Sequence, residues 1–97
     1  MVERKIITID LDGIKSVEEF YLRLAERVEL PAHTAINLDA LRDVLLGDIA
    51  ESLAFRWESV TQDVASHPEA LKCLKRMLDE LPHARADISI SYKGCSN

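Results

Sequence analysis

The apolar residues in the first third of the chain change from a strand-like to a helical spacing. Isoleucines and a leucine crowd into residues 6–11, which end at the turn sequence Asp-Leu-Asp-Gly of residues 10–13, a pattern typical of a short β-strand. Ser16 follows as a helix N-cap candidate with Glu19 three residues later, and apolar residues then recur at helical spacing before Pro31. This arrangement predicts an amphipathic helix after the strand.

The middle of the chain predicts a second helix and a second strand. Asn37 is an N-cap candidate, the leucines after it lie on one helical stripe, and Gly47 ends the pattern. Together these signals predict a helix of about ten residues. Apolar and polar residues alternate over residues 53–57, and this period of two predicts a strand. Residues 59–65 are expected to form a short helical turn.

The last third of the chain again has a helical pattern followed by a strand pattern. Pro68 stands where a first-turn proline belongs, and apolar residues at helical spacing reach Leu81, so we expect a helix that ends before Pro82. Residues 88–92 alternate and predict the final strand. Helices between strands favour an α/β fold with a small three-stranded parallel sheet, three to four helices and right-handed crossovers. The clean alternation of the last two strands predicts that one sheet face is partly exposed to solvent.

Length and composition fit one compact domain over residues 1–97. The chain has 97 residues, of which 47% are hydrophobic and 30% charged, which suits a single hydrophobic core and argues against disorder. Residues 92–97 are expected to form a loose tail. Cys73 lies in a helical apolar pattern, where we expect it in the core, and Cys95 lies in the polar tail. Two such cysteines predict reduced thiols rather than a disulfide.

The charge balance favours protein binding over nucleic-acid binding. Seventeen acidic residues against 12 basic ones give a net charge of −5, whereas a nucleic-acid surface needs a clustered basic patch. A basic protein partner is favoured instead. No long apolar run follows the charged residues 1–5. We therefore expect no signal peptide, no membrane span and a cytoplasmic location.

The most informative charges lie on the predicted second helix. At 100° per residue, Asp39 and Asp43 fall opposite the leucine stripe and are exposed neighbours. Like charges at this i, i+4 spacing repel by roughly 0.2–0.5 kcal/mol, so the pair opposes the stability of its own helix. The pair is either an acidic binding face or an ordinary solvated helix face. Leu46, expected to be exposed beside these charges, is either an apolar contact in an interface or a scattered surface leucine.

The sequence contains no strong candidate for a catalytic residue. General acid catalysis by a carboxylate pair needs one group in an apolar pocket, which exposed helix neighbours do not supply. His33, His67 and His83 lie far apart, without a metal-binding spacing, and the three glycines of the chain form no phosphate loop. Trp57 is expected in the core. We therefore expect a binding protein without cofactor or metal rather than an enzyme.

Residues 30–47 resemble the binding loop and second helix of the barstar family. The core of this segment, Asn-Leu-Asp-Ala-Leu-x-Asp-x-Leu-x-Gly at residues 37–47, agrees with the family at every fixed position. The predicted order of strands and helices also agrees over essentially the whole chain. The resemblance implies a barstar-like intracellular inhibitor that blocks the active site of a small basic ribonuclease. Asp39 and Asp43 then occupy positions at which acidic side chains stand in for RNA phosphates.

The resemblance also implies which residues contact the partner besides these aspartates. They are His33, Thr34, Asn37, Arg42, Leu46, Gly47 and, from the last helix, Glu80. A small length difference leaves Lys75 or Arg76 as alternatives to Glu80. Residues 33–35 replace two tyrosines and a glycine of the family, and Arg42 replaces a tryptophan. The contact surface is therefore expected to be smaller and more mixed in charge.

Two interpretations of the function follow from these residues. In the first, the chain is a monomer when free and inhibits a basic ribonuclease or related toxin through residues 33–47. Arg42 is then expected to repel basic enzymes that offer it no acidic partner. In the second, the chain keeps the same fold but binds a different toxin or a protein that is not a nuclease. The missing aromatic residues motivate this alternative.

Overall fold

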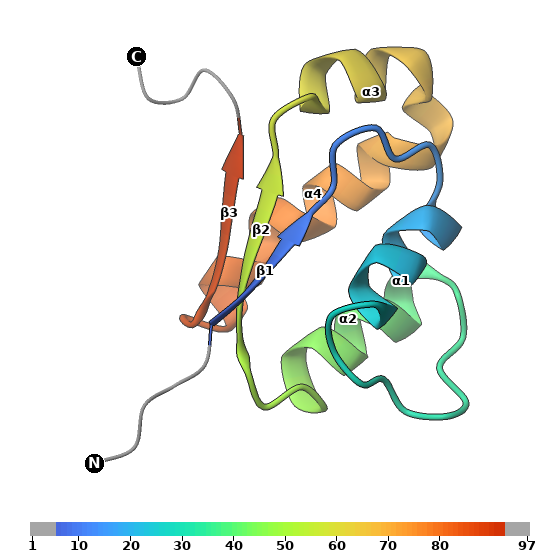
Figure 1. The fold of residues 1–97 in the computed structure, drawn as a ribbon. Helices are drawn as coiled ribbons and strands as arrows, with labels where there is room; N and C mark the ends of the chain where they lie inside the picture. The colour runs from blue at the N-terminus through green and yellow to red at the C-terminus, as the bar shows by residue number, and fades with distance from the viewer. Residues whose placement is uncertain (1–5, 93–97) are drawn as a thin grey trace.

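The central element of the fold is a parallel β-sheet, seen in a computed structural model that describes residues 6–92. Its strands are β1 (Ile6–Asp10), β2 (Ser52–Trp57) and β3 (Ile88–Tyr92). They lie in the order β1-β2-β3, and both neighbouring pairs are parallel (Figure 1). The expected small parallel α/β sheet is therefore confirmed. Tyr92 belongs to β3 and not to the predicted tail, whose other residues lie outside the described part of the chain, as does Cys95.

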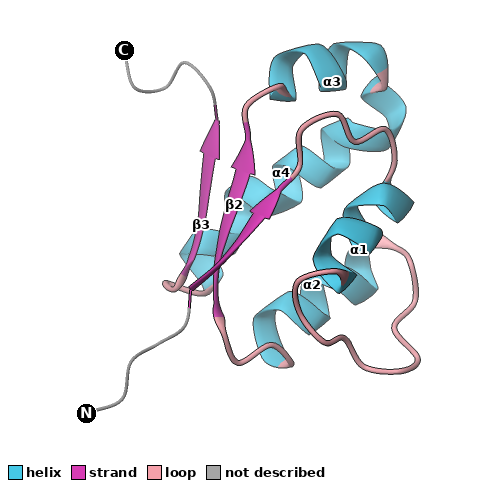
Figure 2. Cartoon of the chain, viewed as in Figure 1, coloured by secondary structure: helices cyan, strands magenta, loops and turns pink. Residues whose placement is uncertain are grey.

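Four helices connect these strands and cover one face of the sheet. They are α1 (Val17–Ala25), α2 (Leu38–Gly47), α3 (Val60–Ser66) and α4 (Pro68–Ala84). Because strand order follows chain order, both crossovers step in the same direction, and their shared right-handedness places the helices on one side (Figure 2). On the opposite face Thr8, Arg56 and Ser89 are exposed. The prediction of a sheet with one solvated face is confirmed.

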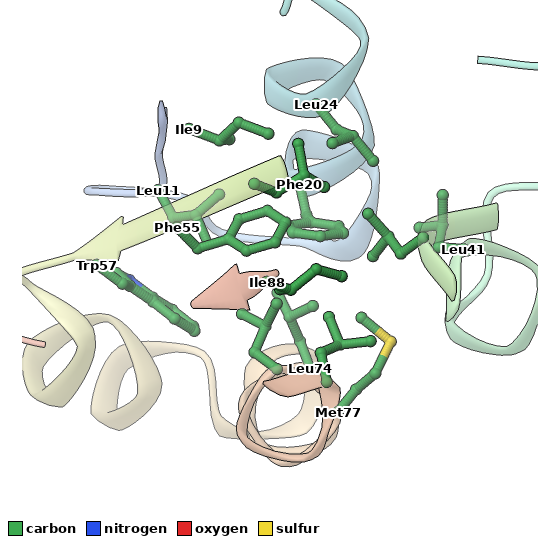
Figure 3. Packing of buried hydrophobic residues seen from close by; sticks show 14 of the residues in the cluster. Ile9, Leu11, Phe20, Leu24, Leu41, Phe55, Trp57, Leu74, Met77 and Ile88 are labelled. Atoms are coloured by element: carbon green, nitrogen blue, oxygen red, sulfur yellow. The ribbon is translucent and has the colours of Figure 1, made fainter. Parts of the chain in front are cut away.

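The hydrophobic core fills the space between the covered face of the sheet and the helices. Ile9, Phe55 and Ile88, one residue from each strand, are each about 1% exposed. The ring of Phe20 in α1 lies 5.8 Å from the ring of Phe55, and Leu41 enters the same cluster from α2 (Figure 3). Three separate helices are thus anchored to one cluster, since α4 contributes Leu74 and Met77.

Trp57 closes the core at the carboxyl end of β2, as its alternating strand pattern predicts. Its side chain is fully buried, and its indole N–H donates a hydrogen bond of 2.9 Å to the Asp63 carboxylate. The same oxygen accepts from the hydroxyl of Ser59 at 2.6 Å and from the backbone N–H of Gly13 at 2.9 Å. Gly13 has a φ of 81°, a conformation that favours glycine. This network joins the loop after β1 to the start of α3.

The helix limits differ from the sequence expectation at two places. α1 ends at Ala25, and the chain then turns so that the Val28 N–H still donates to Leu24 O at 3.0 Å. α4 does not end before Pro82 but continues to Ala84, and the Arg85 N–H closes its last turn on Leu81 O at 2.8 Å. A proline this close to the helix end removes one backbone hydrogen bond while most of the helix keeps its own.

The prediction that Cys73 packs in the core is wrong, because its side chain is exposed. The buried stripe of α4 contains Leu74, Leu78 and Leu81. Cys73 precedes Leu74 by one residue, about 100° around the helix, and so lies at the margin of the stripe. The periodicity identified the helix correctly, but the margin of its apolar face depends on what packs against it.

The Asp63 network predicts a specific loss of stability in acid. Burial acts to raise the pKa of Asp63, but hydrogen bonds from Ser59, Trp57 and Gly13, with the charge of His67, lower it below its ordinary value of 3.8. A lowered folded-state pKa stabilises the protein fully above 3.8, and this contribution is lost as the pH falls below that value. Asp63→Asn should therefore show a smaller loss of unfolding free energy between pH 5 and pH 2.5 than wild type, measured by urea unfolding.

A matched variant on the same helix tests whether this effect belongs to the carboxylate. Thr61 is exposed on α3 and makes no side-chain hydrogen bond among residues 6–92. Thr61→Ala should keep the pH dependence of the wild type. Equal acid sensitivity of Asp63→Asn and wild type would show that this network does not contribute to it.

Candidate partner-binding surface

The geometry of α2 follows from its cap and its leucines. Asn37 adopts an extended conformation, and its side-chain oxygen accepts a hydrogen bond of 2.8 Å from the Ala40 N–H, which satisfies one of the unpaired donors at the helix start. Leu41, Val44 and Leu45 are buried against the core. The predicted helix, its cap and its end at Gly47 are confirmed. Asn37 thus has a structural role that is independent of any partner.

Asp39 and Asp43 lie on the outward side of α2. Both side chains are exposed, and neither makes a side-chain hydrogen bond or an ion pair among residues 6–92. The two carboxylates are one helical turn apart and repel each other modestly. Asp39 lies in the first turn of α2, where the helix dipole stabilises a negative charge, but Asp43 has no such compensation. The fold therefore presents an unpaired acidic pair.

α4 brings further charges beside α2. A shallow groove of about 190 Å³ separates the two helices. It is lined by Leu38, Asp39, Arg42, Cys73, Arg76, Met77 and Glu80. Glu80 is thus placed next to the acidic side of α2, together with Arg76. Lys75 instead donates to Asp79 at 3.0 Å and lies 4.8 Å from the centre of the Tyr92 ring.

The loop before α2 is ordered by its own hydrogen bonds. The backbone N–H and the hydroxyl of Thr34 both donate to Pro31 O, at 3.1 Å and 2.8 Å. His33 is exposed at the turn, and Thr34 is half-buried. Neither residue lines the groove between α2 and α4. The candidate contacts therefore form two adjoining areas, one on the loop and one on the helices.

Leu46 differs from the sequence expectation, whereas Gly47 ends the helix as expected. Leu46 is not an exposed leucine: it is half-buried and packs against the core cluster. Gly47 ends α2, its φ is not positive, and a Cβ atom at this position would have no neighbour within 4 Å among residues 6–92 apart from the adjoining residues and the backbone of its own helix. Nothing in the described fold requires glycine at this position.

Arg85 positions the far end of α2, a role that the sequence alone did not indicate. Its guanidinium donates to Leu45 O at 2.8 Å and to Glu51 O at 2.9 Å, while its Nε donates to the Asp87 carboxylate at 2.7 Å. The hydrogen bond from Arg85 lowers the pKa of Asp87, although partial burial opposes this. An Arg-x-Asp sequence before a strand is a signal for this pair. The carbonyl in α2, 40 residues away, is not predictable from it.

The described part of the chain offers neither a metal site nor a membrane span. Among residues 6–92, no three or more His, Cys, Asp or Glu side chains are grouped so that they could hold a metal ion. No helix within the same residues is both long and apolar enough to span a membrane. The groove between α2 and α4 is also smaller than the roughly 300–1,000 Å³ of small-molecule sites.

Comparison with known proteins identifies the family of this chain. A family model described as "Barstar (barnase inhibitor)" matches residues 4–93, nearly the whole chain. A search of curated proteins found no match. The family is one of inhibitors and not of catalysts. The matched range includes the sheet, the acidic side of α2 and Glu80 in α4, and the observed α/β fold agrees with it. The chain therefore belongs to the barstar family.

Proposed function

We propose that this protein inhibits a small basic ribonuclease by covering its active site with the loop before α2 and with α2 itself. The observation that carries the proposal is the unpaired acidic pair on the outward side of α2, Asp39 and Asp43. Glu80 from α4 adds a third carboxylate beside it. His33 and Thr34 in the loop, with Arg42 and Gly47 in α2, complete the proposed contact surface. Leu46 contributes only its half-exposed part.

The chemistry of RNA cleavage explains why carboxylates suit this role. A ribonuclease must hold phosphate groups, so its active site carries cationic side chains. Carboxylates placed against those cations form charge-assisted hydrogen bonds, which are shorter and stronger than neutral ones. The net charge of −5 also favours rapid encounter with a basic enzyme at low salt. Binding then blocks the substrate without any chemical step.

Other parts of the proposal follow from this mode of action. Steric and electrostatic blocking needs no cofactor, no metal and no catalytic residue, so we propose that the chain is not an enzyme. An inhibitor of a ribonuclease protects the RNA of the cell that makes it, which suits action in the cytoplasm. The proposed complex contains one inhibitor and one ribonuclease, and the free protein is a monomer.

The direct test is an inhibition assay with purified small secreted guanyl-preferring ribonucleases. Hydrolysis of RNA is followed while the protein is added from substoichiometric to excess amounts, at low and at physiological salt. Inhibition that saturates at one equivalent and weakens with salt supports the proposal. The proposal is wrong if no ribonuclease of this group is inhibited at any ratio.

Gly47→Ala separates a binding role of this glycine from a structural one. Because the site is free of steric contacts and its φ is ordinary, the added methyl group should leave the unfolding free energy unchanged or raise it by about 0.4–1 kcal/mol. If the ribonuclease approaches the end of α2 closely, the same methyl group should weaken inhibition. Urea unfolding and the inhibition constant are measured on the same preparation. Unchanged inhibition would remove Gly47 from the contact surface.

A second candidate function is binding to a different toxin or to a protein that is not a nuclease. The specific observation in its favour is the composition of the contact surface, which carries Arg42 and the sequence His-Thr-Ala at residues 33–35. Capture experiments on cell extracts with the wild type and Asp43→Ala distinguish the two functions. A partner retained only by the wild type and without ribonuclease activity would favour this alternative.

A further inference from the structure

Two arginines from different helices line the same groove without a partner in the fold. Arg42 belongs to α2 and Arg76 to α4, and both are exposed. Among residues 6–92 neither of them forms a hydrogen bond or an ion pair through its side chain. Arg23, Arg56 and Arg85, in contrast, are each held by the fold. The guanidinium groups of the groove are therefore available to another molecule.

These cations change the electrostatic character of the proposed contact surface. Asp39 and Glu80 lie in the groove with the two arginines, and Asp43 is one helical turn from Asp39. The surface thus carries three carboxylates and two guanidinium groups, in a chain whose net charge is −5. A partner that presents only cations would meet attraction and repulsion side by side. A partner with charges of both signs could pair every group.

Burial in an interface increases the difference in affinity between a partner that presents only cations and a partner with charges of both signs. Binding costs free energy when a guanidinium group loses its hydrating water and gains no carboxylate in return. A cation on the partner that faces the guanidinium group adds direct repulsion. Discrimination between partners often depends on such a repulsive element as well as on attractive contacts. Because Arg42 and Arg76 lie on separate helices that are both anchored in the core, the backbone positions from which the two side chains extend are fixed on the two sides of the groove.

We propose that Arg42 and Arg76 determine which ribonuclease this protein binds. The ribonuclease that fits places an acidic side chain against these two arginines, next to the cations that face Asp39 and Asp43. Ribonucleases whose contact area is basic throughout are bound poorly. This inference rests on the proposed function, and it adds the chemistry of the partner surface and the residues that select it.

Barnase, the enzyme named in the description of the family, is the probe for this inference. Arg42→Glu and Arg76→Glu, tested separately, should each strengthen inhibition of barnase by about tenfold or more at low salt, because a repelling cation becomes an attracting carboxylate. The matched control is Arg27→Glu, because Arg27 is exposed, lies outside the groove and forms no hydrogen bond or ion pair through its side chain among residues 6–92. It changes the net charge equally and should alter inhibition by less than about threefold. Thermal unfolding verifies that each variant is folded.

The outcomes separate this inference from the proposed function. A gain for the groove variants that exceeds the gain for Arg27→Glu supports the inference, even if the wild type inhibits barnase poorly. Inhibition by both groove variants that is weaker than that by Arg27→Glu would mean that barnase itself places an acidic side chain against the arginines, which also supports the inference. Inhibition by both groove variants equal to that by Arg27→Glu overturns it. If Asp43→Ala abolishes inhibition in that case, the proposed function stands alone. If neither the wild type nor the groove variants inhibit barnase, the inference is also overturned, and other ribonucleases decide the proposed function.

Discussion

Replacing Asp43 by lysine is expected to abolish inhibition of the proposed target ribonuclease while leaving the fold intact. Removing one partner of a buried, hydrogen-bonded charge pair in an interface costs about 2–5 kcal/mol or more. Lysine adds repulsion from the cations that hold RNA phosphates, so the loss should exceed that of Asp43→Ala. The inhibition constant is measured at low and at physiological salt.

The same substitution should not destabilise the free protein. Asp43 is exposed, and its side chain forms no hydrogen bond or ion pair among residues 6–92. Lysine at this position replaces a repulsive i, i+4 pair with an attractive one to Asp39, a change of a few tenths of a kcal/mol in favour of the helix. Loss of binding with equal or higher stability is the signature of a contact residue, and urea unfolding provides the second measurement.

Glu26→Lys is the control for net charge in this experiment. Glu26 is exposed at the end of α1, outside the groove and the loop, and the substitution changes the net charge by the same amount. It should lower the rate of association only modestly, because it affects long-range attraction alone. If Asp43→Lys inhibits as well as Glu26→Lys, the outward side of α2 is not the binding surface.

Replacing Trp57 by alanine is expected to be the most damaging single change to stability. The side chain is fully buried and is the largest in the core. Truncation of a buried aromatic residue to alanine typically costs about 3–5 kcal/mol, the sum of lost burial and of the cavity that remains. A small domain has only about 5–15 kcal/mol in total. Urea unfolding should therefore show a much lower midpoint or an unfolded protein at room temperature.

Trp57→Phe separates packing from hydrogen bonding at the same position. Phenylalanine keeps most of the apolar volume but lacks the N–H group that donates to Asp63 at 2.9 Å. A net loss of about 1.5–3 kcal/mol is expected for a hydrogen bond to a charged group, so this variant should remain folded and be less destabilised than Trp57→Ala. Equal destabilisation of the two variants would mean that packing of the indole ring is not the dominant contribution.

The fold was predictable largely because its signals are local. Asn37 and the leucine spacing after it specify α2, since a cap and a helical period involve only neighbouring residues. Alternation over residues 53–57 and 88–92 specified two strands in the same way. The chain order of strands and helices then led to a parallel sheet, because right-handed crossovers leave few other arrangements. The exposed acidic pair on α2 followed from the angle between successive residues.

The sequence interpretation was wrong at residues whose burial or helical state depends on tertiary packing and not on local sequence. Pro82 lies inside α4 because its helix is held by packing of the leucines before it, and a proline in the last turn removes little. Cys73 is exposed because it lies at the edge of the buried stripe. Leu46 is half-buried because the core extends to the end of α2. In each case the outcome depends on which element packs against the residue.

The sequence by itself determined the elements of this protein, its family resemblance and the acidic face of α2, because periodicity, capping and charge are properties of short segments. Only the tertiary structure decided what surrounds that face. Packing of α2 and α4 on the same sheet places Glu80 and Arg76 beside Arg42, and it directs Arg85 to a carbonyl at the end of α2. These neighbours are distant in sequence, and only the relative position of the two helices brings them together.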